Sequence, residues 1–151
     1  MGMFDSMHIS ASGLGAERVR MDVIAQNLAN VNTTRGADGQ AYRRQEVVFQ
    51  AIESSAGTSG VSGTGSARGS DRDAPGGGVE VVGVVADQSE LRQVYDPSHP
   101  DANDDGYVAL PNVNPVTEMV DMMTATRAYE ANVTAMNAAK SMALKALDIL
   151  R

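Results

Sequence analysis

A short acidic segment in the second half of the chain has the side chains to bind a calcium ion. Asp101, Asn103 and Asp105 stand at alternate positions, where the oxygen ligands of an EF-hand loop wrap a hard cation. Gly106 follows at the position where that loop turns sharply. The twelfth position requires a bidentate Glu and here is Asn112, and nearby prolines oppose flanking helices. We interpret the segment as a polar turn, with a calcium-dependent binding module as an alternative.

No other group of residues has a spacing typical of a catalytic or metal site. The sequence has no cysteine, which excludes disulfides, thiolate metal sites and cysteine nucleophiles. His8 and His99 lie far apart, and neither has a second ligand or a nucleophile at a recognisable spacing. We therefore predict no catalytic residue, no cofactor, no metal and no enzymatic activity. An enzyme stays an alternative, because catalytic groups converge in space and not in sequence.

The composition favours helices that pack along narrow apolar seams. Of the 151 residues, 42% are hydrophobic, but there is no Trp, and there are only two Phe and four Tyr. Such a chain is long enough for one ordinary domain. Its net charge of -7 argues against nucleic acid as a partner, because acidic chains repel phosphate backbones. We find no signal-peptide pattern and no apolar run of about 18 residues, so we expect no membrane insertion.

A helix is predicted at the N-terminal end of the chain. Its apolar residues recur every seven positions, as at a helix seam: Met7, Leu14, Met21 and Leu28. Gly13 and Gly15 interrupt it, at a cost of about 1 kcal/mol each relative to Ala. After Asn30, residues 32–36 supply the breakers that end the helix.

A second, longer helix is predicted to begin after Pro115, with Thr117 as its cap, and to run nearly to Arg151. One apolar line at seven-residue spacing contains Met122, Tyr129, Met136, Ala143 and Leu150. A second line contains Met119, Val133 and Leu147. At ~1.5 Å per residue the helix would be about 50 Å long, more than a compact domain of this size can bury. Much of this seam must therefore contact another molecule.

The segment between the helices is predicted to be a small β region. It contains short runs rich in Val and Tyr, namely residues 42–52, 79–85, 90–95 and 107–110. Residues 54–78 are mostly Gly, Ser, Thr and Ala, which predicts a flexible loop. The predicted fold class is α+β, with an N-terminal helix in 1–36, a β-rich region in 37–112 and a C-terminal helix in 113–151. We expect the two helices to form a coiled-coil-like α domain.

Several runs of residues resemble a known family. SASGL at residues 10–14 and MDVIAQNLANVNT at 21–33 resemble the N-terminal signature of bacterial flagellar rod and hook proteins. YDPSHPDAN at 95–103, PNVNPV at 111–116 and RAYEAN at 127–132 resemble the proximal-rod members of that family. The alternatives are another axial subunit of the rod and hook family, the calcium-dependent module, or a periplasmic enzyme.

The resemblance implies a structural subunit of the proximal rod, the drive shaft that crosses the periplasm and transmits motor torque to the hook and filament. Such subunits travel unfolded through the flagellar type III export channel, without a cleaved signal peptide, and polymerise beneath a cap. The implied partners are the chain itself, other proximal and distal rod subunits, the rod-base adaptor protein, the flagellar type III export apparatus and the rod cap. Nucleic acid is not among them.

Within such a rod, residues of both helices are expected to contact neighbouring subunits. On the first helix these are Leu14, Met21, Asn27, Leu28, Asn30 and Asn32. On the second they are Met122, Tyr129, Val133, Met136, Leu147 and Leu150. The three Asn side chains would satisfy backbone groups at a helix end that neighbours bury. Gly13 and Gly15 would be points of close approach.

Overall fold

The computed structural model describes residues 3–36, 39–52 and 77–149. The element order is α1 (Met3–Ala29), β1 (Gln45–Ile52), β2 (Gly78–Ala86), β3 (Arg92–Tyr95), β4 (Tyr107–Leu110) and α2 (Pro115–Ile149). Two long helices and two small antiparallel sheets confirm the α+β class. The predicted loop at 54–78, except for its last two residues, and Leu150 lie outside the described residues.

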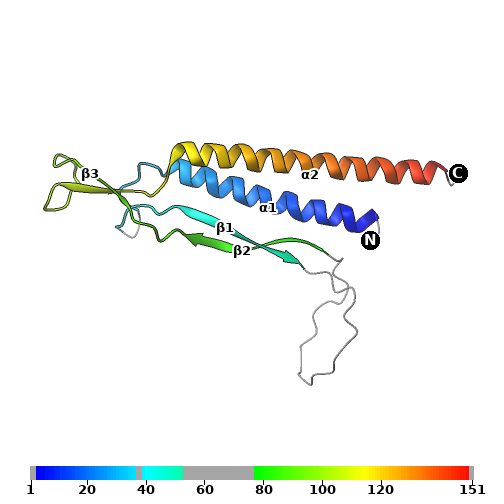
Figure 1. Cartoon of the computed structure of the whole chain (residues 1–151), viewed down its shortest axis with the longest axis horizontal. Coiled ribbons are helices and arrows are strands. Elements are labelled where there is room, and N and C mark those ends of the chain that lie inside the picture. Colours follow the sequence, from blue (N-terminus) through cyan, green and yellow to red (C-terminus); the bar gives the residue numbers. More distant parts are fainter. Residues whose placement is uncertain (1–2, 37–38, 53–76, 150–151) are drawn as a thin grey trace, which may run out of the picture.

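The two helices lie side by side and antiparallel along the long axis of the molecule, and α2 extends past the N-terminal end of α1 (Figure 1). Asn114 caps α2: its carbonyl accepts from the Glu118 N–H at 3.0 Å, and its Oδ1 accepts from the Val116 N–H at 3.0 Å. Pro115 occupies the first helical position, where its missing N–H costs nothing. The predicted cap, Thr117, is therefore wrong.

The face of α2 that packs inward is shifted by one residue from the second predicted line. Ala125, Ala139 and Glu118 are buried, at seven-residue multiples from one another. Of the predicted line, Met119 is 53% exposed and Val133 is half-buried, and Leu147 is 65% exposed where α2 extends past α1. Successive helical residues differ by about 100° around the axis, so this shift turns Met119 away from the interior.

Small side chains allow the helices to approach closely. A Cβ at Gly13 would lie 2.9 Å from Nδ2 of Asn132 on α2, so this glycine is a point of close approach within the subunit. A Cβ at Gly15 would meet no atom within 4 Å. The two glycines that interrupt α1 therefore have different surroundings.

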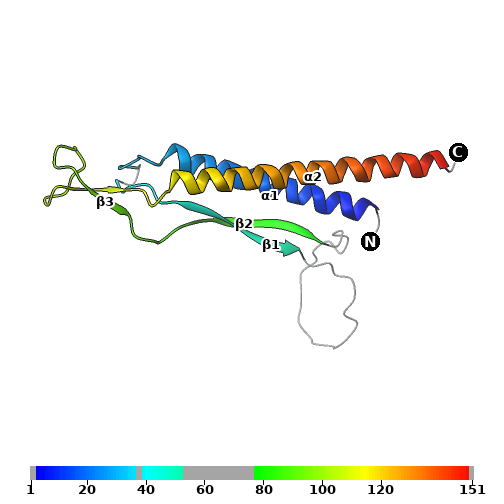
Figure 2. The same ribbon diagram turned by 45° about the horizontal axis from the view of Figure 1, so that its top comes forward.

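The hairpin β1–β2 packs along α1, which lies between the hairpin and α2 in Figure 1. Figure 2 shows that the start of α2 crosses in front of α1. The antiparallel register of the hairpin joins Gln45 to Ala86, and a bulge interrupts the pairing between Val48 and Phe49. The Ser12 hydroxyl on α1 accepts from the Val79 N–H at 3.1 Å and thereby holds one end of the hairpin.

The ribbon β3–β4 lies at the end of the molecule opposite the two termini (Figure 1). In the acidic segment before β4, Asp101 accepts from the Thr34 hydroxyl at 2.9 Å and lies 3.5 Å from the Arg35 guanidinium. Asn103 Oδ1 accepts from the Tyr107 N–H at 2.7 Å. These oxygens close and anchor a turn, and the described residues contain no group of three His, Asp or Glu that could hold a metal.

Neither of the described helices combines the length and the apolar composition that a membrane span requires.

Candidate functional site

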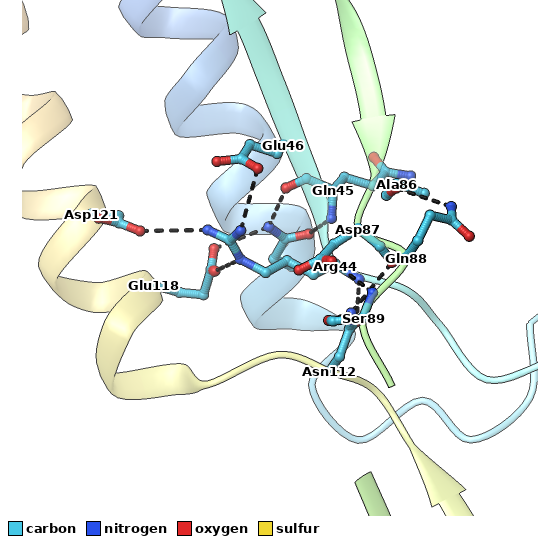
Figure 3. Close-up of polar contacts among 11 residues, drawn as sticks. Arg44, Gln45, Glu46, Ala86, Asp87, Gln88, Ser89, Asn112, Glu118 and Asp121 are labelled. Atoms are coloured by element: carbon cyan, nitrogen blue, oxygen red, sulfur yellow. Dashed lines mark hydrogen bonds and ion pairs between the residues drawn. The ribbon is translucent and has the colours of Figure 1, made fainter. Parts of the chain in front are cut away.

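A cluster of polar side chains joins α1, β1 and α2 near the start of α2 (Figure 3). We call it the polar junction, and it comprises Asn27, Tyr42, Arg44, Gln45, Asn112, Glu118 and Asp121. Its members come from the last turns of α1, the strand β1 with the segment before it, and the residues before and within the first turns of α2. Segments far apart in the sequence therefore meet at one point.

Asn27 is the centre of the polar junction and is 1% exposed. Its Nδ2 donates to the Gln45 carbonyl at 2.8 Å and to Glu118 Oε2 at 3.0 Å. Its Oδ1 accepts from the Gln45 N–H and the Tyr42 hydroxyl, both at 2.9 Å. The amide thus makes the four hydrogen bonds that an Asn side chain can make. It fixes the first residue of β1 to α1. The role expected for Asn27 from the sequence was to cap the end of the helix, and it does not do so.

Arg44 and Glu118 form the charged pair of the polar junction. Arg44 Nε donates to Glu118 Oε1 at 2.6 Å, and the Glu118 side chain is 1% exposed against 22% for Arg44. The other guanidinium nitrogens lie 3.8 Å from Glu46 and 3.7 Å from Asp121. The hydrogen bond to Glu118 raises the pKa of Arg44 although burial acts in the opposite direction, so the guanidinium stays charged. Burial and, to a smaller extent, the charge of Glu118 raise the pKa of Tyr42.

Asn112 ties the polar junction to the end of β2 (Figure 3). Its Oδ1 accepts from the Arg44 N–H at 2.8 Å, and its Nδ2 donates to Ser89 Oγ at 2.7 Å. The Ser89 N–H donates to Asp87 Oδ1 at 2.8 Å, and this hydrogen bond lowers the pKa of Asp87. The segment that leads into α2 is therefore attached to the chain on both sides of the hairpin's open end, just before β1 and just after β2.

The polar junction is built to hold geometry. The carboxylate of Glu118 is occupied by Arg44 and Asn27, and the crevice beside it has a volume of about 170 Å³. Breaking a buried ion pair by removing one partner costs about 3–5 kcal/mol, because a buried charge is left uncompensated. The cluster therefore behaves as a rigid joint between the hairpin and the helix pair.

The predicted contact residues differ widely in exposure. Half-buried are Leu14, Met21, Leu28, Met122, Tyr129, Val133 and Met136. Asn30 is also half-buried; it donates to the Gln26 carbonyl at 2.9 Å and accepts from the Thr33 hydroxyl at 3.1 Å, so it does cap the end of α1. Asn32 and Leu147 are exposed. Leu150 lies outside the described residues.

Arg44 and Glu118 were not among the predicted site residues. One signal in the sequence pointed to Glu118, since it stands seven residues before Ala125 and fourteen before Asn132, on a line of small residues. A carboxylate on a line that packs inward requires a partner. Nothing in the spacing indicates that this partner is Arg44, which is 74 positions away.

Two apolar faces on opposite sides of the molecule have no partner among the described residues. On α2, the exposed residues of the helix face turned away from α1 are Val116, Met119, Val120 and Met123, which we call the α2 ridge. On the hairpin, the exposed apolar residues turned away from α1 are Val48, Val82 and Val85, which we call the valine face. Met142, Leu144 and Leu147 are also exposed, near the end of α2. Exposed apolar patches of this kind mark sites of protein contact.

Comparison with known proteins identifies the class of this protein, because family models match both ends of its chain. A family model described as "Flagella basal body rod protein" matches residues 7–37, which include most of α1. A second, described as "Flagellar basal body rod FlgEFG protein C-terminal", matches residues 104–149, which include β4 and α2. Paired terminal helices with these matches define a flagellar basal-body rod protein.

Relatives similar over their whole length narrow this class. The chain is 49% identical to the flagellar basal-body rod protein FlgC of Bacillus subtilis, over 99% of both chains. It is 44% identical to FlgC of Borreliella burgdorferi, over 100% of this chain and 99% of the other. It is 38% identical to FlgC of Salmonella typhimurium, over 99% and 98%. The chain belongs to the FlgC family of flagellar basal-body rod proteins, which confirms the resemblance found in the sequence.

Proposed function

We propose that the chain is a subunit of the proximal rod that polymerises into a shaft across the periplasm and transmits motor torque to the hook and filament. The observation that carries this proposal is the apolar surface left uncovered on α2, seen together with the family of the chain. A subunit that stayed alone would gain nothing by exposing Leu144 and Leu147 at 59% and 65%. A polymer buries such side chains at every repeat.

In this proposal the helices of residues 1–36 and 113–151 form a coiled-coil-like α domain, and residues 37–112 lie beside it. Contacts between unlike faces propagate without closing, so they generate a helical tube. Torque must pass between the hairpin and the helix pair without bending the subunit. The saturated hydrogen bonds of Asn27 and the Arg44–Glu118 pair support this rigidity.

The proposed partners are other copies of the chain, other proximal and distal rod subunits, the rod-base adaptor protein, the rod cap and the type III export apparatus. In this proposal, export through the type III apparatus precedes folding. No catalytic step is assigned to the chain. Among the predicted contact residues, Leu147 has the greatest need of a neighbour, whereas Asn27 already uses its amide within the subunit.

The substitution Leu147→Asp tests the proposal. We expect the free energy of unfolding of the purified monomer to change by less than about 0.5 kcal/mol, because the side chain is exposed. In the rod, the same change would place an unpaired carboxylate in an apolar contact, which costs several kcal/mol at each repeat. We expect the subunit to be secreted but rods and hooks to be absent from isolated basal bodies.

Asn137→Asp is the matched control, since it introduces the same side chain at an exposed polar position of α2. Cells with this control should build rods and swim. Normal rods and swimming with Leu147→Asp would refute the contact at this residue. Loss of the subunit from the secreted fraction would instead assign Leu147 to export. Normal rods in cells that lack the chain altogether would refute the proposed function itself.

A further inference from the structure

We infer that the valine face of one copy packs against the α2 ridge of a second copy beside it in the rod. The inference rests on the proposed function, because it names the partner for two faces that a polymer would cover. In the view of Figure 1, the hairpin and α2 lie on the two outer sides of the molecule, with α1 between them. One copy can therefore use both faces at once, one toward each neighbour. Such a contact is heterologous and propagates sideways from copy to copy.

The valine face follows from the pleat of the hairpin. Along β1, Val47 and Phe49 are half-buried against α1, whereas Val48 between them is 42% exposed. Val85 lies opposite Glu46 in the ladder, so it points to the same outer side as Val48 and is 55% exposed. The bulge leaves Val82 without a partner in β1 and 60% exposed.

The α2 ridge is a continuous stripe. Its four residues are 48–68% exposed and occupy positions i, i+3, i+4 and i+7 from Val116, which lie on one helix face. Met side chains adapt their shape to an uneven surface, and the stepped face formed by a bulged hairpin is such a surface. An apolar ridge and an apolar ribbon of similar extent thus stand on opposite sides of one molecule.

Charges at the two rims are complementary. Glu80 pairs with Gln50 in the ladder and is exposed at the edge of the valine face. Arg127 follows Met123 by four residues, so it continues the α2 ridge, and it is exposed. Within the described ranges neither Glu80 nor Arg127 forms a salt bridge. A neighbour could supply the missing counter-charge to both.

The two rims also stand at similar heights along the molecule. Asn27 binds both Gln45 and Glu118, which places these two residues at one level. Glu80 is paired five residues beyond Gln45, or ~17 Å along the strands. Arg127 is nine residues beyond Glu118, or ~14 Å along the helix. A second copy in the same orientation, moved sideways with an axial shift of less than about one helical turn, would bring the charges and the apolar residues together.

Engineered cysteines test this contact without background, because the chain has none of its own. Val82→Cys and Met123→Cys are introduced together into the full-length chain, which replaces the native copy in its host. Basal bodies are isolated, oxidised mildly and separated on a non-reducing gel. We expect a ladder of dimers, trimers and larger multiples of the chain, because each copy carries both partners of the contact.

Two controls define the geometry. Each single cysteine variant should give no ladder, and neither should Val82→Cys combined with Thr134→Cys, which is exposed on the same side of α2 but three turns further on. The pair Val85→Cys with Met119→Cys tests the same contact at its other end. This second pair tests the contact if the first pair of cysteines prevents assembly of the rod.

A charge exchange provides an independent measurement. Glu80→Arg and Arg127→Glu should each lower the yield of the cross-linked ladder several-fold, and the double exchange should restore it. Dimers from either single cysteine variant would overturn the inference, because they indicate a symmetric contact. Cross-links only to a different protein, or none while the chain is present in the rods, would also overturn it and leave the proposed function intact. Absence of the native chain from basal bodies would refute both.

Discussion

The two ends of α2 differ in the side chains that they bury and expose. At its start, Glu118 is 1% exposed and hydrogen-bonded to Arg44 and Asn27. Near its finish, the helix extends past α1, and Leu144 and Leu147 are 59% and 65% exposed. Polar groups that are buried must be paired within the subunit, because an unpaired buried charge is costly in any state. Apolar side chains carry no such requirement, so they can stay exposed until a neighbour covers them.

This difference separates two roles along one helix. Hydrogen bonds are directional, so the polar junction sets the position of the hairpin against the helices before assembly. Apolar burial is non-directional and scales with area, so exposed apolar residues can adapt to a neighbour. The comparison therefore predicts that substitutions at the polar junction act on the stability of the monomer, whereas substitutions at the far end of α2 act on assembly.

The largest effect on the monomer is expected from Arg44→Met. It leaves the buried Glu118 carboxylate without its cation, and we expect a loss of about 3–5 kcal/mol in the free energy of unfolding, measured by urea denaturation of the purified chain. Arg127→Met removes an exposed arginine and should change it by less than about 0.5 kcal/mol. Replacing both partners, by Arg44→Met with Glu118→Leu, should recover most of the loss. Equal midpoints for the two arginine variants would break the comparison.

A smaller effect is expected from Tyr42→Phe, which removes the hydroxyl that donates to Asn27 at 2.9 Å. We expect a loss of about 1 kcal/mol near neutral pH. The pKa of Tyr42 is raised above its ordinary value of 10.0, so the unfolded chain releases this proton first as the pH rises. The stabilisation is complete below pH 10.0 and is lost above it. Stability should therefore fall less steeply above this pH in Tyr42→Phe than in the native chain, and identical slopes would contradict this account.

The smallest effects are expected in α1, away from the polar junction. Gly15→Ala should stabilise the monomer by about 0.5–1 kcal/mol, because its Cβ meets open space and Ala favours the helix. Gly13→Ala should gain less or destabilise, since its Cβ would lie 2.9 Å from the Asn132 amide. Thermal unfolding of both variants measures this contrast. If Asn132→Ala does not improve the stability of the Gly13→Ala chain, the close approach is not the cause.

Sequence reasoning predicted the helices, the small β region and the family, and it missed the polar junction. The helices were predictable because apolar residues recur every seven positions over many turns, as from Met122 to Met136. The cap of α2 was assigned to Thr117, although Asn114 before Pro115 has the side chain and position of a cap. Arg44 could not be assigned to the polar junction, because the spacing of residues in the sequence does not indicate which distant residue a charged side chain beside a strand will pair with.

By itself, the sequence determined which segments become helices, where the first of them ends and which family the chain belongs to. These properties depend on local propensity and on recurrences along one chain. Only the tertiary structure decided which side of α2 faces inward at its start. The lines through Glu118 and Met119 both have seven-residue spacing and differ by one position, or about 100°. Glu118 faces inward because Asn27 and Arg44, which are distant in sequence, pair with its carboxylate. Met119 is thereby turned outward.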